Sequence, residues 1–193
     1  GIIPVLNAGC TIEYGAIGNQ ILNARTDYKN ITLSGSGSKF LSSGCFPAGT
    51  VRITDNAVLE TLNFTFGDVG TNLTMDGGRF RIAGTGTKPD MQGSYNISGG
   101  VIEFIGGTPA TSQTIRSSAS IFYSNIEINS LYVANSNANI NLHAGGSFTL
   151  KSGSIFTIND ESITGQTGAQ TVTIESGARF VCGDADGFSG GTG

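Results

Sequence analysis

The strongest constraint on this chain is a short apolar pattern that returns about every 22 residues, a spacing in the range of solenoid repeats. Val51, Leu73 and Tyr95 each begin a segment of alternating apolar and polar residues, and they are equally spaced along the chain. The pattern returns at Phe148 and Val172, with a slightly longer interval between them. A constant period of about 20 to 50 residues is typical of a solenoid, in which each small unit stacks on its neighbour.

Each unit contains two short strands with a polar turn between them. In one clear copy, Leu73-Thr74-Met75 and Phe80-Arg81-Ile82 flank the turn Asp76-Gly77-Gly78. A period of two directs every second side chain to one face of a strand. Because one unit cannot bury that face alone, the units must stack and pair their strands in parallel. Gly, Asn, Asp and Ser gather in the turns because they tolerate positive φ.

We therefore predict an all-β fold, a single-stranded parallel β-helix with about eight coils of 22–24 residues and little helix. The whole chain, residues 1–193, is expected to form one domain. An antiparallel sandwich also contains many short strands, but the equal intervals and the low proline content favour the solenoid. Seven phenylalanines are expected to form inward stacks: Phe64, Phe66, Phe80, Phe104, Phe148, Phe156 and Phe180.

Composition narrows the functional classes. The net charge is −4 and the ten basic residues are scattered, which argues against nucleic-acid binding, because that needs grouped cations. No apolar run approaches the roughly 18 residues of a membrane span. Glycine is abundant, with 30 residues, and the glycine-rich residues 184–193 are predicted to be a flexible tail. Composition and fold type together predict an extracellular or cell-surface location.

The chain contains three cysteines, Cys10, Cys45 and Cys182, and no Cys-x-x-Cys pair that would indicate a structural zinc site. Cys10 and Cys45 are candidates for a disulfide between early coils, and the alternative is two buried free thiols. Cys182 lies in an apolar strand segment and is expected to be a small core residue.

A longer similarity overlays the short repeat. Thr11-Ile12-Glu13-Tyr14 is similar to Val101-Ile102-Glu103-Phe104, and Tyr28–Leu33 is similar to Tyr123–Ile128. The sequence therefore predicts an internal duplication, with one half at approximately 11–100 and the other at 101–183.

These segments also carry a resemblance. Their order, with Gln113-Thr114-Ile115 between them and Phe148-Thr149-Leu150-Lys151-Ser152-Gly153 after them, resembles the β-strand repeats of surface proteins and adhesins of Bacteroidetes. Those proteins are secreted by the type IX route. The resemblance covers most of residues 11–182. It implies a right-handed parallel β-helix on the cell surface, and it brings no catalytic residues to transfer.

Few residues suggest chemistry. His143 is the single histidine, and no serine or cysteine nucleophile motif accompanies it. Asp55, Asp76 and Glu175 fall at equivalent turn positions, so some of them could align on one edge as a carboxylate cluster. The plainer interpretation is that they solvate turns. Glu13 and Glu103 occupy matching strand positions, which outward-facing slots explain equally well.

Metal sites are weakly indicated. Asp184-Ala185-Asp186-Gly187 resembles the start of a calcium loop, but the remaining oxygen ligands of such a loop are missing. Asp184 and Asp186 are therefore weak calcium candidates, and we predict no other metal and no cofactor.

The function predicted from the sequence is a noncatalytic structural or adhesive module of a bacterial cell-surface protein or fibre. Uncapped coil ends expose strand edges, so end-to-end self-association is expected. Its partners would be further copies, neighbouring domains of a longer surface protein, or glycans. The alternative is a carbohydrate-active parallel β-helix, similar to a polysaccharide lyase or hydrolase, or a glycan-binding module.

Overall fold

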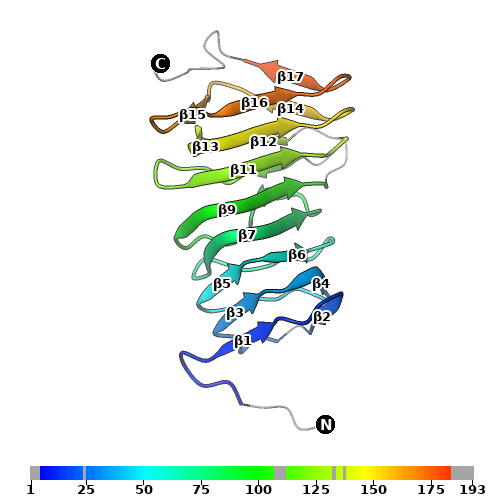
Figure 1. The fold of residues 1–193 in the computed structure, drawn as a ribbon, viewed down its shortest axis with the longest axis vertical. Coiled ribbons are helices and arrows are strands. Elements are labelled where there is room, and N and C mark those ends of the chain that lie inside the picture. The colour runs from blue at the N-terminus through cyan, green and yellow to red at the C-terminus, as the bar shows by residue number, and fades with distance from the viewer. Residues whose placement is uncertain (1–4, 24, 107–111, 132–133, 137, 184–193) are drawn as a thin grey trace.

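The computed structural model describes residues 5–23, 25–106, 112–131, 134–136 and 138–183, which form an upright stack of strands (Figure 1). The fold prediction is confirmed: the protein is all-β, and its parallel strands stack as a β-solenoid of about 7 turns. The described residues contain no helix. Handedness stays a prediction, and the predicted flexible tail, 184–193, lies outside the described residues.

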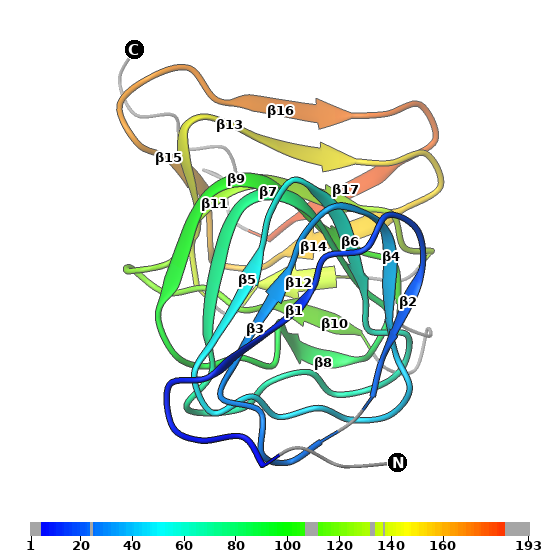
Figure 2. The same ribbon diagram turned by 60° about the horizontal axis from the view of Figure 1, so that its bottom comes forward.

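The strands line three faces, around which the chain winds (Figure 2). The first face consists of β1 (Thr11–Tyr14), β3 (Asn30–Leu33), β5 (Thr50–Ile53), the first parts of β7 (Asn72–Ile82), β9 (Tyr95–Phe104), β11 (Phe122–Ile128) and β13 (Ile140–Leu150), and β15 (Ile163–Gly165). The second face consists of β2 (Gln20–Leu22), β4 (Ser36–Leu41), β6 (Asn56–Glu60), the later parts of β7, β9, β11 and β13, and β16 (Thr171–Ile174). The third face consists of β8 (Gly86–Lys88), β10 (Gln113–Ile115), β12 (Ala134–Ser136), β14 (Ile155–Ile158) and β17 (Arg179–Cys182).

The coils are shorter at the N-terminal end than the sequence period predicts. Ile12 pairs with Ile31 and Ile31 pairs with Val51, and both intervals are shorter than the one between the paired residues Val51 and Leu73. In the middle of the stack the interval is longer, since Ile102 pairs with Ile126. The period seen in the sequence therefore describes the central coils. In the first two coils, the return from the second face to the first is shorter: residues 23–29 and 42–49, compared with residues 61–71 in the third coil.

The registers bear on the predicted duplication. Thr11–Tyr14 forms β1 on the first face, whereas Val101–Phe104 is the later part of β9 on the second face. The two similar segments thus occupy different positions in their coils. The internal duplication itself stays a prediction.

The corner between the first and second faces depends on glycine. β7 and β9 run through this corner without a break, and each bends at a pair of glycines. Gly78 and Gly100 have φ values of 65° and 76°, a left-handed region that side chains with a Cβ disfavour. Asp55 takes the same role one coil earlier, with φ 56°. The turn residues of the sequence repeat are therefore placed as predicted.

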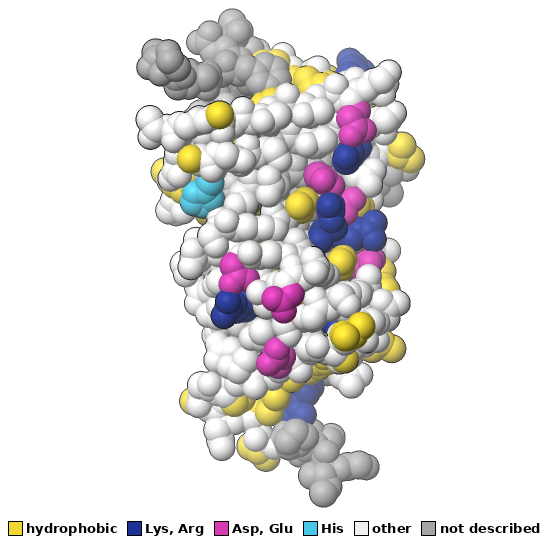
Figure 3. All heavy atoms as spheres, viewed as in Figure 1, with side chains coloured by type: hydrophobic (Ala, Val, Ile, Leu, Met, Phe, Trp, Pro, Cys, Tyr) yellow, Lys and Arg dark blue, Asp and Glu magenta, His cyan; other side chains and the backbone are white. Residues whose placement is uncertain are grey.

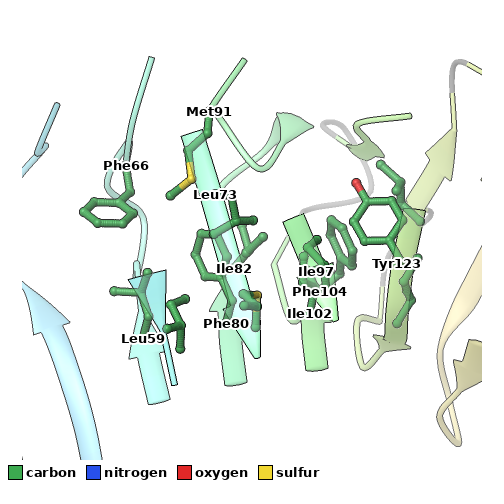
Figure 4. Close-up of a cluster of buried hydrophobic side chains, with 14 of the residues drawn as sticks. Leu59, Phe66, Leu73, Phe80, Ile82, Met91, Ile97, Ile102, Phe104 and Tyr123 are labelled. Atoms are coloured by element: carbon green, nitrogen blue, oxygen red, sulfur yellow. The ribbon is translucent and has the colours of Figure 1, made fainter. Parts of the chain in front are cut away.

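The core consists of columns of inward side chains, one from each coil. On the second face, Leu59, Phe80, Ile102, Ile126 and Phe148 follow one another in register, and each is at most 1% exposed. Figure 4 shows the middle of this packing, where side chains from neighbouring coils interdigitate. Burying a side chain of this size stabilises a protein by about 1.5–3 kcal/mol relative to leaving it exposed.

The predicted phenylalanine stacks are largely confirmed. Five of the seven are buried in the core: Phe66, Phe80, Phe104, Phe148 and Phe156. Phe64 and Phe180 are partly buried and pack against that core. The Phe148, Phe156 and Phe180 rings follow one another at centroid distances of 5.0 and 5.5 Å, so they join the second and third faces near the C-terminal end.

A lysine continues the apolar column at its N-terminal end. Lys39 pairs with Leu59 and is fully buried. Its Nζ donates to the carbonyl oxygens of Ala16, Gly18 and Ser36 at 2.7, 3.1 and 3.0 Å, and to Oε1 of Gln20 at 2.8 Å. Burial lowers the pKa of Lys39. A buried ammonium group is stable only with such partners, so these oxygens allow Lys39 to stand in the core column.

All three cysteines are free thiols in the structure, which for Cys10 and Cys45 is one of the two alternatives left open by the sequence. Cys10 and Cys45 both carry free thiols, so no disulfide joins them. Cys10 directly precedes β1 on the first face. Cys45 lies beyond β4, and its backbone forms an isolated parallel β-bridge with that of Phe66. Burial raises the pKa of Cys45 to about 11, as expected for an inert core thiol. The expectation that Cys182 is a core residue is wrong, because it lies on the last strand described and is exposed.

Candidate functional site

Among the described residues, the largest connected set of ion pairs is a charge ladder on the outside of the second face. We define the charge ladder as Glu60, Arg79, Arg81, Glu103 and Glu127. Glu60, Arg81, Glu103 and Glu127 stand at matching positions of four successive coils. Arg79 lies two residues before Arg81, so both project from the same side of β7. Figure 3 shows acidic and basic side chains gathered along one side of the stack.

Ion pairs tie the four coils together. Arg79 Nη1 donates to Glu103 Oε2 at 3.0 Å and to Glu127 Oε2 at 2.6 Å. Arg81 donates through Nε to Glu103 Oε2 at 2.9 Å and through Nη1 to Glu60 Oε1 at 3.1 Å. Each arginine thus joins carboxylates that are far apart in the sequence. A single exposed ion pair contributes little to the free energy of unfolding, but a half-buried network of shared ion pairs contributes more.

Glu103 is the centre of the charge ladder, and its side chain is only 7% exposed. Burial alone would raise the pKa of the Glu103 carboxyl group. The hydrogen bond from Asn129 Nδ2 to Oε1, at 2.9 Å, and the charges of Arg79 and Arg81 outweigh burial, so the pKa is lowered. Glu103 is therefore held as a carboxylate that accepts hydrogen bonds, and it is a poor proton donor near neutral pH.

We expect Glu103→Gln to lower the free energy of unfolding by about 1–3 kcal/mol at neutral pH, because charge-assisted hydrogen bonds are lost. Since the pKa of Glu103 is lower in the folded state, its contribution is present above the ordinary pKa of 4.5 and is lost as pH falls through the folded value. Chemical denaturation of the wild type and of Glu103→Gln, from neutral to acidic pH, measures this contribution to the free energy of unfolding.

The difference between the two proteins should therefore narrow as the solution becomes more acidic than pH 4.5. Asp160→Asn is the matched control, because Asp160 is exposed and forms no ion pair within the described part of the chain. It should change the stability by less than about 0.5 kcal/mol. A pH-independent difference between wild type and Glu103→Gln would contradict the assigned role.

The acidic turn residues do not form one cluster. Asp76 lies at the corner between the first and second faces, where a hydrogen bond from Thr54 and an ion pair with Arg52 lower its pKa. Asp55 lies at the same corner one coil below and accepts a hydrogen bond from the Gly35 amide at 3.1 Å. Glu175 lies at the next corner and pairs with Lys151 Nζ at 2.9 Å. Each of the three carboxylates therefore contacts groups near its own corner, in line with the interpretation that they serve the turns and do not form a shared cluster.

The matching of Glu13 with Glu103 does not hold in space. Glu13 lies on the first face and accepts a short hydrogen bond from Ser34 Oγ at 2.5 Å. Glu103 lies on the second face within the charge ladder. The similarity in sequence therefore relates two carboxylates with different surroundings.

His143 lies among neutral groups. Its Nδ1 is 3.2 Å from Oε1 of Gln166, and its ring centroid is 5.5 Å from that of Phe122. Neither neighbour is a nucleophile or an acid, so this arrangement gives the imidazole no partner for proton relay.

No group of three or more His, Cys, Asp or Glu side chains that could hold a metal ion occurs in the described ranges. The calcium candidates Asp184 and Asp186 lie outside those ranges. Within the same ranges there is no helix long and apolar enough to cross a membrane.

Comparisons with known proteins give no guide to function. No protein-family model matches the chain, and neither the curated proteins nor the solved structures contain a match. The contacts of the chain itself therefore carry the functional argument.

Proposed function

We propose that this protein is a noncatalytic structural module, a stiff rod whose ends stack on further copies of itself. The support comes from what its reactive side chains contact. At least six of the ten lysines and arginines form ion pairs, chiefly between coils. The Lys39 ammonium group is enclosed by carbonyl and amide oxygens. The charged groups of these side chains therefore form contacts within the stack and stabilise it.

The observation that carries the self-association is the exposure of the last coil. Val172 and Ile174 pair with Phe148 and Leu150, which are fully buried under them. Val172 and Ile174 themselves are 38% and 45% exposed, although they stand in the same inward columns. Capping repeats of solenoids have a polar outer surface, and β16, at the C-terminal end of the described stack, does not have that character.

The opposite end presents strand edges. Ile17, in the corner between β1 and β2, is 91% exposed, and the inward residues Ile12 and Tyr14 are partly buried. Among the described residues, β1 and β2 each pair with a strand on one side only, as does β16. Such edges are templates for pairing with another chain.

A second copy, placed head to tail, is the partner that fits both ends. All strands of the stack run parallel, so β16 of one copy and β2 of the next would point in the same direction. The contact would repeat the coil-on-coil packing that already joins neighbouring coils. A head-to-tail contact of this kind generates a filament when the rotation does not close into a ring.

We expect Val172→Lys combined with Ile174→Lys to abolish the association, because two charges would enter the apolar columns of the interface. Light scattering on chromatographically separated protein should give the monomer mass for this double variant and a larger mass for the wild type at the same concentration. Thr173→Lys is the matched control, because Thr173 lies on the outward side of the same strand, opposite Thr149. It should associate like the wild type.

Equal masses for the wild type and the double variant would contradict the proposed contact. Loss of association in Thr173→Lys to the same degree would also contradict it, because the effect would then come from charge alone. Far-ultraviolet circular dichroism shows whether each variant keeps its strands.

We further propose an extracellular, cell-surface setting, as in the surface proteins of Bacteroidetes that the repeats resemble. A stiff rod suits a spacer or fibre subunit there. Detection of the protein on intact cells by a surface-restricted label would support this setting, and labelling only after lysis would contradict it.

One observation favours the carbohydrate-active alternative. The charge ladder brings three carboxylates and two arginines together on one face, and these are the residue types that act on polysaccharides. Against it, a general acid needs a carboxyl group with a raised pKa, whereas that of Glu103 is lowered. Reducing ends or unsaturated products from a polysaccharide, absent with Glu103→Gln, would contradict the noncatalytic proposal.

A further inference from the structure

A polar pocket of about 280 Å³ lies at the corner where the chain enters the first face. Two loops line it, one leading into β9 and the other leading from β10 into β11. Its side chains include Gln92, Ser94, Tyr95, Arg116, Ser118 and Ser120. The charge ladder contributes no residue to the pocket, so the two sites are separate.

Arg116 is held firmly in the wall of this pocket. Its backbone amide donates to the Lys88 carbonyl at 2.7 Å, and its carbonyl accepts a short hydrogen bond from the Tyr123 hydroxyl. Its side-chain Nε donates to the Pro89 carbonyl at 2.8 Å. The two terminal guanidinium nitrogens have no partner within the described part of the chain. They are therefore available to a ligand.

The charge of Arg116 is not balanced within the pocket. No carboxylate is among the described side chains that line it. The neighbouring Asp90 is engaged by Lys88 Nζ at 2.6 Å, and its other oxygen accepts from the Phe66 amide at 3.2 Å. A guanidinium group with free terminal nitrogens binds a planar carboxylate with two parallel hydrogen bonds. The pocket thus favours an anionic ligand.

The remaining wall is suited to hydroxyl groups. Ser118 and Ser120 hold each other through their Oγ atoms at 3.1 Å, and Ser94 Oγ donates to Asn72 Oδ1 at 2.9 Å. A hydroxyl group that donates one hydrogen bond still accepts others, so these oxygens remain open to a polyhydroxylated ligand. Pockets for drug-sized ligands span about 300–1,000 Å³, so this one fits a single sugar ring.

We propose that this pocket binds one acidic sugar unit, a pyranose ring with a carboxylate, with Arg116 on the carboxylate and the serines on the ring hydroxyls. This goes beyond the structural role proposed above and does not depend on it. The lining residues belong to the middle coils, away from the two ends of the stack, so a stacked rod would carry one such site for each copy.

The test is a titration of ¹⁵N-labelled protein with a short oligogalacturonate, followed by nuclear magnetic resonance. The backbone amides of Ser94 and of residues 117–121 should shift and saturate. Arg116→Gln should weaken binding at least tenfold. Ser120→Asp, a change at an exposed position, should weaken it similarly, because it adds negative charge to the pocket wall.

Three comparisons decide the proposal. Arg52→Gln, which removes an exposed arginine outside the pocket, should leave the affinity unchanged. The neutral galactose oligomer of the same length should bind at least tenfold more weakly than the acidic one. Unchanged binding by both Arg116→Gln and Ser120→Asp, equal binding of the neutral oligomer, or equal binding of inorganic sulfate at the same amides would overturn the assignment. The mass measurements above are unaffected by any of these outcomes.

Discussion

Replacing Phe80 with alanine is expected to lower the free energy of unfolding by about 3–5 kcal/mol, the range for truncating a buried aromatic residue. Phe80 is 1% exposed and lies in register between Leu59 below and Ile102 above. Its ring meets that of Phe66 edge to face, with centroids 6.3 Å apart. The cavity would therefore open between three coils at once and could not close by moving a single neighbour.

Denaturant unfolding followed by circular dichroism measures the total loss, and hydrogen exchange locates it. In a solenoid, each coil is stabilised mainly by its immediate neighbours. The amides of β6, β7 and β9 should therefore lose more protection than those of β14 and β17. Thr74→Ala, an outward change on the same strand, should cost less than about 0.5 kcal/mol. Uniform loss of protection along the whole rod would contradict the nearest-neighbour account.

Replacing Gly100 with alanine is expected to destabilise the protein by about 3 kcal/mol or more, because two independent penalties combine. The residue has φ 76°, which costs a residue with a Cβ about 1–2 kcal/mol. An added Cβ would also lie 2.2 Å from the carbonyl oxygen of Gly77 in the coil below. That oxygen belongs to the backbone, so the coils would have to move apart.

Two further glycines separate these penalties. Gly145 has the same φ of 76° but open space around the position that a Cβ would take, so Gly145→Ala should show only the backbone cost. Gly70 has open space and no positive φ, so Gly70→Ala should be nearly neutral or slightly stabilising. Thermal unfolding of the three variants should therefore rank Gly70, Gly145 and Gly100 in order of increasing damage. Any other order would contradict the account of the corner.

The central coils could be predicted from the sequence because their local pattern is complete. In Leu73–Ile82, alternating apolar residues and a paired-glycine turn stand at the same spacing as in the following coil. The first coil could not be predicted as well. Its corner between Tyr14 and Gln20 is longer, and its inward column contains Gln20 and Lys39 in place of apolar residues.

The charge ladder could be predicted only in part. The sequence indicates that Glu103 faces outward on its strand. The pairing of Arg79 with Glu127 joins residues 48 positions apart, across two coils. Such a contact depends on strand register and on the length of each intervening loop, and neither follows from local alternation.

The pocket around Arg116 could not be predicted, for a related reason. Its wall joins residues 92–95 to residues 116–121, and apart from Tyr95, the first residue of β9, both segments are loops. Apolar periodicity predicts which side chains enter the core, but it carries no information about where two loops meet at a corner. A basic residue between two strands, with no acidic residue near it in the sequence, is the one signal that points to this position.

The most direct test of the central claim, that the stack of coils continues from one molecule to the next, is sedimentation equilibrium of the wild-type protein over a thousandfold range of concentration. We predict a mass of 19.8 kDa at the lowest concentration and a progressive rise through multiples of that mass as the concentration increases. A mass of 19.8 kDa throughout the range would contradict the claim.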